Sequence, residues 1–463
     1  MLNFSSVKLG YISQGLSAGI NLLMLPFVLF YLPSSSVGIW YNFSLLLALV
    51  LLLDFGMSST LLRHTAYAWA GAIDIRKVGL SEQFSGSVNQ ELLSDVFRSG
   101  VYIYRVISII SFIIISTAGS YYIYNIAKTE SDFDIVFISW AIYAAAACFN
   151  IYSCYWIPIL KGIGSISEYY KVNVLIKLIQ LVLTILGLIY GYDLIAISSA
   201  YFISVVVGRF LFKLKFFKAL EREDISKDYF LSLYDKKRVT DLVLVSKTSI
   251  FKQGGLSISN YVLDKVSLLF VTIFLGLEYS ASYGLTVQAF SVLTVTSNVY
   301  YQTMSPKIIN LKVLGETLES FRLFCKCLKV QFFIILLGSL FIITFAPTLI
   351  SIFESKTQLL PFHFLCILFV YYIIFNFQLL CVNYLIINNR FDMLFAYILS
   401  GFLYIVLMFL YNYFFEVELI FIILVQLLIL ISYNAWKWPY VVVKDSGLTL
   451  IYILRNYFSI WRL

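Results

Sequence analysis

Charge is what this sequence has least of. Only 13% of its 463 residues are Asp, Glu, Lys or Arg, whereas 61% are hydrophobic. A soluble domain carries roughly 25% charged residues and about 45–50% apolar ones. A chain this apolar cannot cover its own surface in water, so lipid must form most of its boundary. The composition therefore excludes an ordinary soluble protein and predicts a membrane protein.

Signatures of catalysis and of metal binding are also missing. No Gly-Lys dipeptide occurs, which excludes the P-loop of an internal ATPase. The six cysteines show neither the spacing of a zinc site nor that of a disulfide framework. We therefore expect no metal, no cofactor and no nucleic-acid partner, and we do not expect an enzyme.

Long apolar runs fill the chain. A helix needs about 20 apolar residues to cross a bilayer, and twelve segments separated by turn-forming residues meet that length. They are 9–32, 38–62, 99–126, 133–158, 168–190, 193–213, 250–275, 279–304, 327–352, 361–387, 391–413 and 417–438. The sequence predicts an all-α polytopic membrane protein with about twelve transmembrane helices.

Basic residues set the predicted orientation and domains. Of the 33 Lys and Arg residues, 25 lie in the termini, in the loops after even-numbered segments or at the segment ends next to these parts, which indicates that these parts are cytoplasmic. We predict two six-helix bundles around a central cavity and a multi-pass protein with both termini cytoplasmic. The parts are a first bundle at 1–213, a cytoplasmic basic linker and lead-in at 214–249, a second bundle at 250–438 and a cytoplasmic interfacial tail at 439–463.

Polar side chains in the seventh segment form one stripe. A charge at bilayer depth costs about 2.5–3.5 kcal/mol, so such residues usually face a bundle interior or a water-filled cavity. Lys265 directly follows the stripe, and Lys252 directly precedes it. We predict that these residues line the cavity. With spacings of 4, 3 and 4 residues, the stripe consists of Gln253, Ser257, Asn260 and Asp264.

The first segment carries a matching stripe. When its end is aligned with the end of the seventh segment, an offset of 243 residues brings the two stripes into register. Two equivalent polar helices, one opening each half, fit parallel repeats around a cavity. This stripe consists of Gly10, Gln14, Ser17 and Asn21.

Isolated polar residues complete the predicted cavity. Gln288 and Asn298 lie in the eighth segment, Asp54 in the second and Arg105 in the third. Gln and Asn can instead form hydrogen bonds between helices, and Arg105 can extend to the interface. Pro26 removes a backbone hydrogen bond from the first segment, which predicts either a hinge or a static kink.

Two motifs and the arrangement of two sets of six helices resemble a known superfamily. The motifs are Leu53-Asp54-Phe55-Gly56-Met57, running on to Leu62-Arg63, and Asn260-Tyr261-Val262-Leu263-Asp264-Lys265, running on to Phe274-Leu275-Gly276. They resemble the multidrug/oligosaccharidyl-lipid/polysaccharide exporter superfamily, and most closely its bacterial O-antigen flippases. The resemblance implies alternating access in the bacterial inner membrane. It also implies movement of an undecaprenyl-pyrophosphate-linked oligosaccharide to the periplasmic leaflet, in concert with polysaccharide-assembly proteins.

The predicted residues suit that substrate. Lys265, Lys252 and Arg105 would face the pyrophosphate, and the lipid tail would stay among membrane lipids. Asp264 or Asp54 would carry a proton or Na⁺. Two alternatives stay open: an ion-coupled drug or small-molecule exporter of the same fold, and an O-antigen polymerase, which would need a large periplasmic loop.

Overall fold

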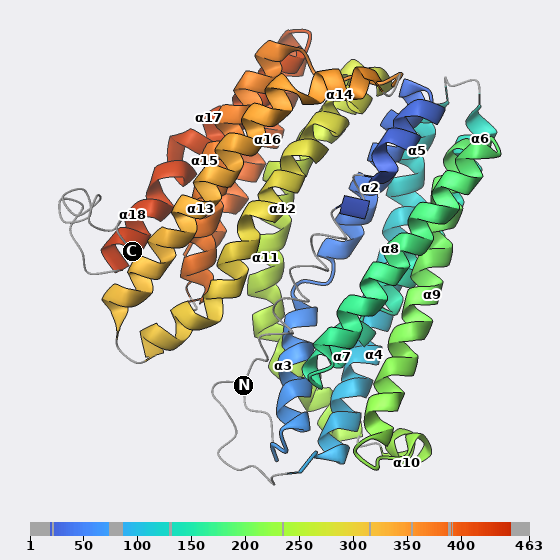
Figure 1. Cartoon of the computed structure of the whole chain (residues 1–463), viewed down its shortest axis with the longest axis vertical. Coiled ribbons are helices and arrows are strands. Elements are labelled where there is room, and N and C mark those ends of the chain that lie inside the picture. Colours follow the sequence, from blue (N-terminus) through green and yellow to red (C-terminus); the bar gives the residue numbers. More distant parts are fainter. Residues whose placement is uncertain are drawn as a thin grey trace. The chain divides into compact units, whose positions relative to one another are not determined.

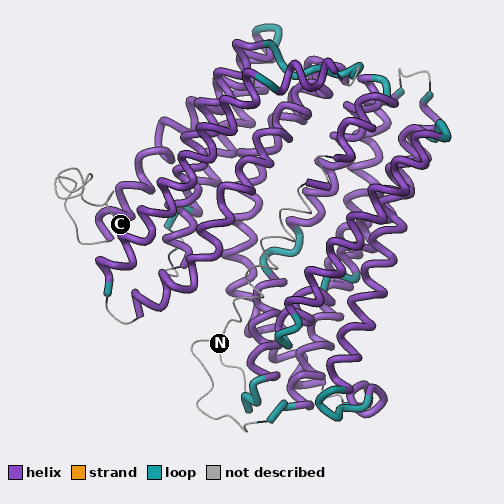
Figure 2. The backbone as a smooth tube through the Cα atoms, viewed as in Figure 1, coloured by secondary structure: helices purple, strands orange, loops and turns teal. Residues whose placement is uncertain are grey.

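The structure is a computed structural model, and it is helical throughout the residues that it describes. Those residues contain helices and loops but no β-strand (Figure 2), which confirms the predicted all-α fold. The described residues are 19–20, 23–73, 87–128, 132–233, 236–313, 316–352, 355–387, 390 and 392–445.

The chain divides into two compact units, Met1–Ile258 and Ser259–Leu463. In the first unit, α9 packs against both α6 and α8, and α6 also packs against α2 and α4 (Figure 1). The helices of this unit are α2 Ser34–Leu52, α3 Met57–Trp69, α4 Gln90–Ile114, the π-helix η1 Ile115–Gly119, α5 Ser120–Ala127, α6 Phe133–Tyr152, α7 Trp156–Gly162, α8 Ile166–Ile189, α9 Asp193–Glu221 and α10 Lys227–Ser232.

Helix α11, Lys236–Leu275, carries the chain from the first unit into the second. In the second unit, α13 packs against α12 and α15, and α15 packs against α18. The helices of this unit are α12 Leu277–Val313, α13 Thr317–Thr344, α14 Ala346–Ile352, α15 Phe362–Ile387, α16 Leu394–Phe414, α17 Leu419–Ile429, the π-helix η2 Leu430–Asn434 and α18 Ala435–Asp445.

Nine helical stretches within the described residues are long and apolar enough to cross a membrane. They correspond to nine of the twelve segments expected from the sequence. Half of segment 9–32 lies outside the described residues, although 23–31 are helical and include Pro26. Segments 250–275 and 279–304 lie in α11 and α12, whose polar side chains lower their hydropathy. The least apolar long helices are therefore α11 and α12, and α11 carries the predicted polar stripe.

The second expected helix is not continuous. Segment 38–62 was expected to be one helix, but α2 ends at Leu52 and α3 begins at Met57. Between them Phe55 and Gly56 both adopt left-handed conformations, with φ values of 46° and 75°. A left-handed residue cannot continue a right-handed helix. The helix therefore breaks at this turn.

The basic segment 214–249 is more helical than expected for a linker. Helix α9 continues to Glu221, and α11 already begins at Lys236. Between them, α10 is anchored on α4, where the Ser94 hydroxyl donates to the carbonyl oxygens of Phe230 at 3.0 Å and of Leu233 at 2.8 Å. The apolar face of the segment is buried through Phe216 and Phe230, so its charges lie on a folded surface.

Candidate functional site

A carboxylate sits at the break between α2 and α3. Asp54 accepts the backbone N–H of Ser58 at 3.2 Å and the Ser58 hydroxyl at 3.2 Å. Ser58 lies in the first turn of α3, where backbone N–H groups have no partner within the helix and the helix dipole favours a negative charge. The sequence therefore places an acid where the new helix can hold it.

A second helix completes this Asp54 cluster. The hydroxyl of Tyr104 on α4 donates to the Asp54 carboxylate and lies 2.8 Å from the Ser58 hydroxyl. Tyr104 is fully buried, and a buried hydroxyl needs such a partner. Two helices thus converge on one carboxylate, which was predicted from the sequence as an ion-coupling candidate.

Phe55, the residue after Asp54, connects the Asp54 cluster to α11. A Cβ atom added to Gly254 would lie 2.1 Å from Cδ1 of Phe55, so the ring lies directly on the helix backbone. Only glycine permits so close an approach. Sequence reasoning missed Gly254, although the Gly254-Gly255 pair inside a helix was a visible signal. Asp54 is therefore one residue away from the helix that leads into the second unit.

A buried cation was not among the predicted site residues. Arg209 on α9 is only 9% exposed, and its Nη2 donates to both the backbone and the side-chain oxygen of Asn150. Its Nη1 is buried and has no hydrogen-bond partner among the described residues. A guanidinium buried without an acid is costly. Sequence reasoning passed over Arg209 because it stands near the expected helix end at 213.

The predicted cations differ in their surroundings. Lys265 on α11 is half-buried, and its Nζ donates to the Ser291 hydroxyl on α12 at 3.2 Å. Gln288, one turn before Ser291, is also half-buried. Arg105, in contrast, is exposed on α4. The structure therefore brings Lys265 into contact with the eighth segment and leaves the Arg105 side chain exposed. The assignment of both residues to a cavity stays a prediction.

Other predicted residues lie outside the part that is described. Gln14 and Asn21 are not among the described residues. Lys252, Asn260 and Asp264 lie in α11, but their side chains are not described. Their assignment to a cavity stays a prediction.

Asn298 takes part in bonds between helices of the second unit. It is buried, and its side-chain oxygen accepts from the Gln331 amide on α13 at 3.3 Å. Nearby, the Asn376 amide on α15 donates to the Thr294 hydroxyl at 3.0 Å. This amide network joins α12, α13 and α15, which is the alternative role that the sequence left open for Asn298.

Metal binding finds no support in the described residues. They contain no group of three or more His, Cys, Asp and Glu residues that could hold an ion. All six cysteines are free. The candidate groups among the described residues are the Asp54 carboxylate, which accepts three hydrogen bonds, and the partly or fully buried cations Lys265 and Arg209.

No known family's sequence profile matches this chain, and no curated protein matches it either. Several solved structures, however, are similar to this chain. An inward-facing multidrug resistance MATE family transporter of the MOP superfamily is similar over 95% of this chain and 96% of its own, with 14% identity and a TM-score of 0.66. An outward-facing structure of such a transporter is similar over 96% of each chain, with 15% identity and a TM-score of 0.60.

A third similar structure is a MOP superfamily transporter from Pyrococcus furiosus, described as having a binding pocket of reverse polarity. It covers 96% of each chain, with 14% identity and a TM-score of 0.54. At such identities the likeness concerns the fold. The chain has the fold of the MATE family transporters of the MOP superfamily, a two-lobe fold of twelve helices, and it is a multi-pass membrane protein.

Proposed function

We propose that this protein is a flippase that moves undecaprenyl-pyrophosphate-linked oligosaccharide units from the cytoplasmic to the periplasmic leaflet by alternating access. The observation that carries the proposal is the buried Arg209 guanidinium, which is bound by the neutral Asn150 and keeps an Nη1 without a hydrogen-bond partner among the described residues. Lys265 adds a half-buried cation, which donates to the Ser291 hydroxyl. A pyrophosphate would supply the missing anion.

The three parts of the substrate make different demands. The sugar needs hydrogen-bonding groups in a wet path, the pyrophosphate needs cations, and the tail can remain in hydrocarbon. Lys265 is the residue we propose for the pyrophosphate, and Lys252, thirteen residues earlier in the chain, is a second candidate. The proposed sugar-facing residues are Gln14, Asn21, Asn260 and Gln288.

The Asp54 cluster suits ion coupling. An ionised Asp54 accepts three hydrogen bonds, whereas a protonated one must give up acceptor capacity and becomes a donor. That change would loosen the turn that presses Phe55 onto Gly254. We propose Asp54, and Asp264 beside Lys265, as sites for a proton or Na⁺, with Pro26 as a hinge in the first helix.

The proposal is tested by reconstitution. Proteoliposomes carry a fluorescent undecaprenyl-pyrophosphate-linked oligosaccharide, and a glycosidase added outside reports how much sugar has reached that leaflet. Lys265→Ala should slow transfer about tenfold or more, because a hydrogen bond to a charged group contributes roughly 1.5–3 kcal/mol. Lys265→Arg should keep most of the rate. Lys171→Ala is the control, because Lys171 is exposed and paired with Glu168.

The same vesicles separate the alternatives. Unchanged transfer by Lys265→Ala would contradict the assignment of the cation. A wild-type protein that exports a cationic dye but moves no lipid-linked sugar would favour the drug exporter, to which two of the similar structures belong by description. The inner-membrane location and the cytoplasmic termini stay predictions, which reporter fusions at both ends would test.

A further inference from the structure

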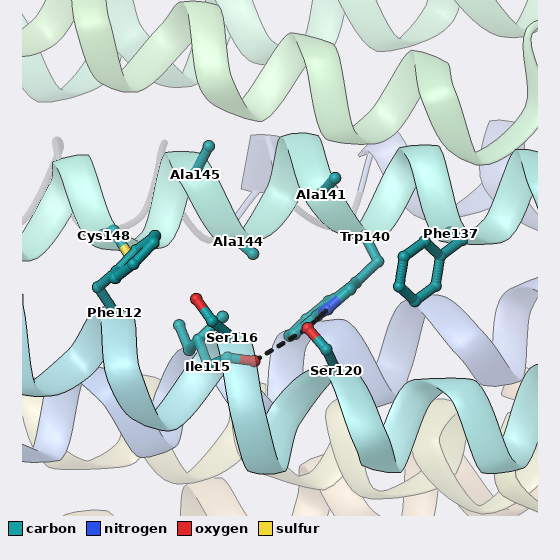
Figure 3. Close-up of a pocket in the computed structure, with 10 residues that line it drawn as sticks. All are labelled: Phe112, Ile115, Ser116, Ser120, Phe137, Trp140, Ala141, Ala144, Ala145 and Cys148. Carbon is teal, nitrogen blue, oxygen red and sulfur yellow. Dashed lines mark hydrogen bonds between the residues drawn. The ribbon is translucent and has the colours of Figure 1, made fainter.

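Helix α6 has two different faces. One face lines a pocket toward α4, η1 and α5, and none of the described residues around that pocket, such as Phe112 and Trp140, is charged (Figure 3). Asn150 lies on the opposite face, about 180° around the helix from Ala141, and holds the buried Arg209 of α9. The polar side of α6 is therefore the side that packs against α9.

Aromatic rings connect Arg209 to a second cation. The Arg209 guanidinium lies 5.8 Å from the centre of the Phe212 ring, and that ring stacks on Tyr169 of α8 at 5.8 Å. The ammonium of Lys161, near the end of α7, lies 3.9 Å from the centre of the Tyr169 ring. The face of an aromatic ring attracts a cation but does not neutralise it. Both cations therefore keep their charge inside the helical packing.

A third cation lies beside Arg209. A Cβ atom added to Gly208 would lie 2.3 Å from Cδ1 of Ile176, so α8 and α9 touch at this point. The next residues along the two helices are Lys177 and Arg209. The helices form an antiparallel hairpin, and successive helical residues point about 100° apart. Lys177 and Arg209 therefore leave the contact on the same side.

Lys177 does not reach the end of its membrane-spanning stretch. It lies at the middle of α8, about 17 Å from each end, which is farther than a lysine side chain extends. Its Nζ donates to Oε1 of Gln180 at 3.3 Å, one turn away from the nearer end of the helix. A charge at such depth is costly and usually marks a substrate or ion pathway.

These three cations lack acidic partners. Among the residues that the structure describes, none of them forms an ion pair with Asp or Glu. Several positive charges in one row favour an anion with more than one negative charge. A phosphate group carries about −1.5 to −2 at neutral pH, whereas a carboxylate carries one charge, and a guanidinium matches the geometry of phosphate.

We propose that Lys161, Arg209 and Lys177 form a path for an oxyanion of the phosphate class, from the end of α7 to the middle of α8. We call it the cation path. The inference rests on the proposed function in treating this anion as part of what the protein moves.

Burial assigns the roles within the cation path. Arg209 is buried, and its Nη1 has no hydrogen-bond partner among the described residues, so an anion can bind there without breaking an existing bond. Lys161 and Lys177 are half-buried, so each can meet the anion on one side of Arg209. Arg209 is therefore the central binding residue.

Isothermal titration calorimetry tests the cation path. The full-length protein is held in phosphatidylcholine nanodiscs, and inorganic pyrophosphate is the titrant. Arg209→Gln and Lys177→Gln should each weaken binding about tenfold or more, because each removes hydrogen bonds from a charged group. Lys171→Gln is the control and should bind like the wild type, since Lys171 is exposed on the same helix and paired with Glu168.

A variant that supplies the missing acid separates binding from stability. Asn150→Asp has the same shape and places a carboxylate against the Arg209 guanidinium. The hydroxyl of Tyr201, which now accepts from the Asn150 amide at 2.9 Å, can donate to the new carboxylate instead. The variant should keep its thermal unfolding midpoint and bind pyrophosphate about tenfold or more weakly. A purely structural Arg209 predicts a stable variant with unchanged binding.

A second set of nanodiscs contains phosphatidic acid and identifies the source of the anion. Weaker pyrophosphate binding to the wild type in these discs supports a lipid phosphate as the ligand, and unchanged binding supports a free phosphate. A wild type that binds no pyrophosphate, or full binding by both Lys177→Gln and Asn150→Asp, overturns the cation path.

Sugar transfer in proteoliposomes is measured in parallel on the same variants. Pyrophosphate binding by a wild type that transfers no sugar overturns the flippase function alone. Full transfer by variants that have lost pyrophosphate binding overturns the cation path alone.

Discussion

The two units handle polar groups inside apolar helices in different ways. In the first unit, the ionisable Asp54 sits at a helix break under donors from two helices, and the charged Arg209 keeps one nitrogen unpartnered. In the second, the neutral amides of Asn298, Gln331 and Asn376 join intact helices. Hydrogen bonds between neutral amides stabilise helix packing in a membrane only slightly. Charges within a membrane, in contrast, mark substrate and ion pathways.

The break is the feature that sets the first unit apart. Asp54 and Phe55 are adjacent, so one short turn carries both the carboxylate and the ring that lies on Gly254. No residue of the amide network is linked to a helix break in the same way. Three sets of substitutions probe this difference, from the strongest expected effect to the weakest.

Removing the carboxylate should have the largest effect. Asp54→Ala removes the acceptor of one backbone N–H and of the Ser58 and Tyr104 hydroxyls. These hydroxyls lie 2.8 Å apart, so one can still donate to the other and two donors are left unmet. We expect a loss of at least about 2 kcal/mol in the free energy of unfolding, since each unmet buried donor costs about 1 kcal/mol or more. Denaturant titration in detergent micelles measures it. Asp54→Asn, which keeps an acceptor oxygen, should lose less stability and yet lose ion-coupled transport.

If Asp54→Asn transported normally and kept its response to the ion gradient, Asp54 would be a structural cap only. The comparison of the two units would then lose its functional meaning.

The contact of Phe55 with α11 should come second. Gly254→Ala places a methyl group into the ring, and overpacking of this kind costs about 1–3 kcal/mol. Phe55→Ala should relieve the clash, so the double variant Phe55→Ala/Gly254→Ala should be more stable than additivity predicts. Gly19→Ala is the matched control, because nothing lies within 4 Å of a Cβ there. Additive effects in the double-mutant cycle would show that the ring and the helix are not coupled.

The fold could be predicted from the sequence because it depends on composition and length. Apolar runs of spanning length are properties of single segments. The same runs also identified α11 and α12, which are less apolar than the other spanning helices. Asp54 and Lys265 were named as site candidates because charge in such a run is conspicuous, and their roles stay predictions.

The remaining features depend on partners distant in the sequence. The π-turn at 115–119 is held in part by Trp140 on α6, and the left-handed turn at Phe55 packs on a glycine some two hundred residues later. The charged segment 214–249 folds because Phe216 and Phe230 bury their rings, which its charge conceals. Arg209 became noticeable only when its burial and its partner Asn150 were known.

The amide network should give the smallest effect. Asn298→Ala and Gln331→Ala each remove one partner of the 3.3 Å bond between α12 and α13. We expect a coupling energy of about 0.6 kcal/mol from a double-mutant cycle in micelles, typical of hydrogen bonds between membrane helices. Transport should be retained in each variant, because Asn298 is buried between helices and its amide also bonds the Thr294 carbonyl. Loss of transport without loss of stability would instead make Asn298 a cavity residue, and the two units would then resemble each other more closely than their hydrogen bonds indicate.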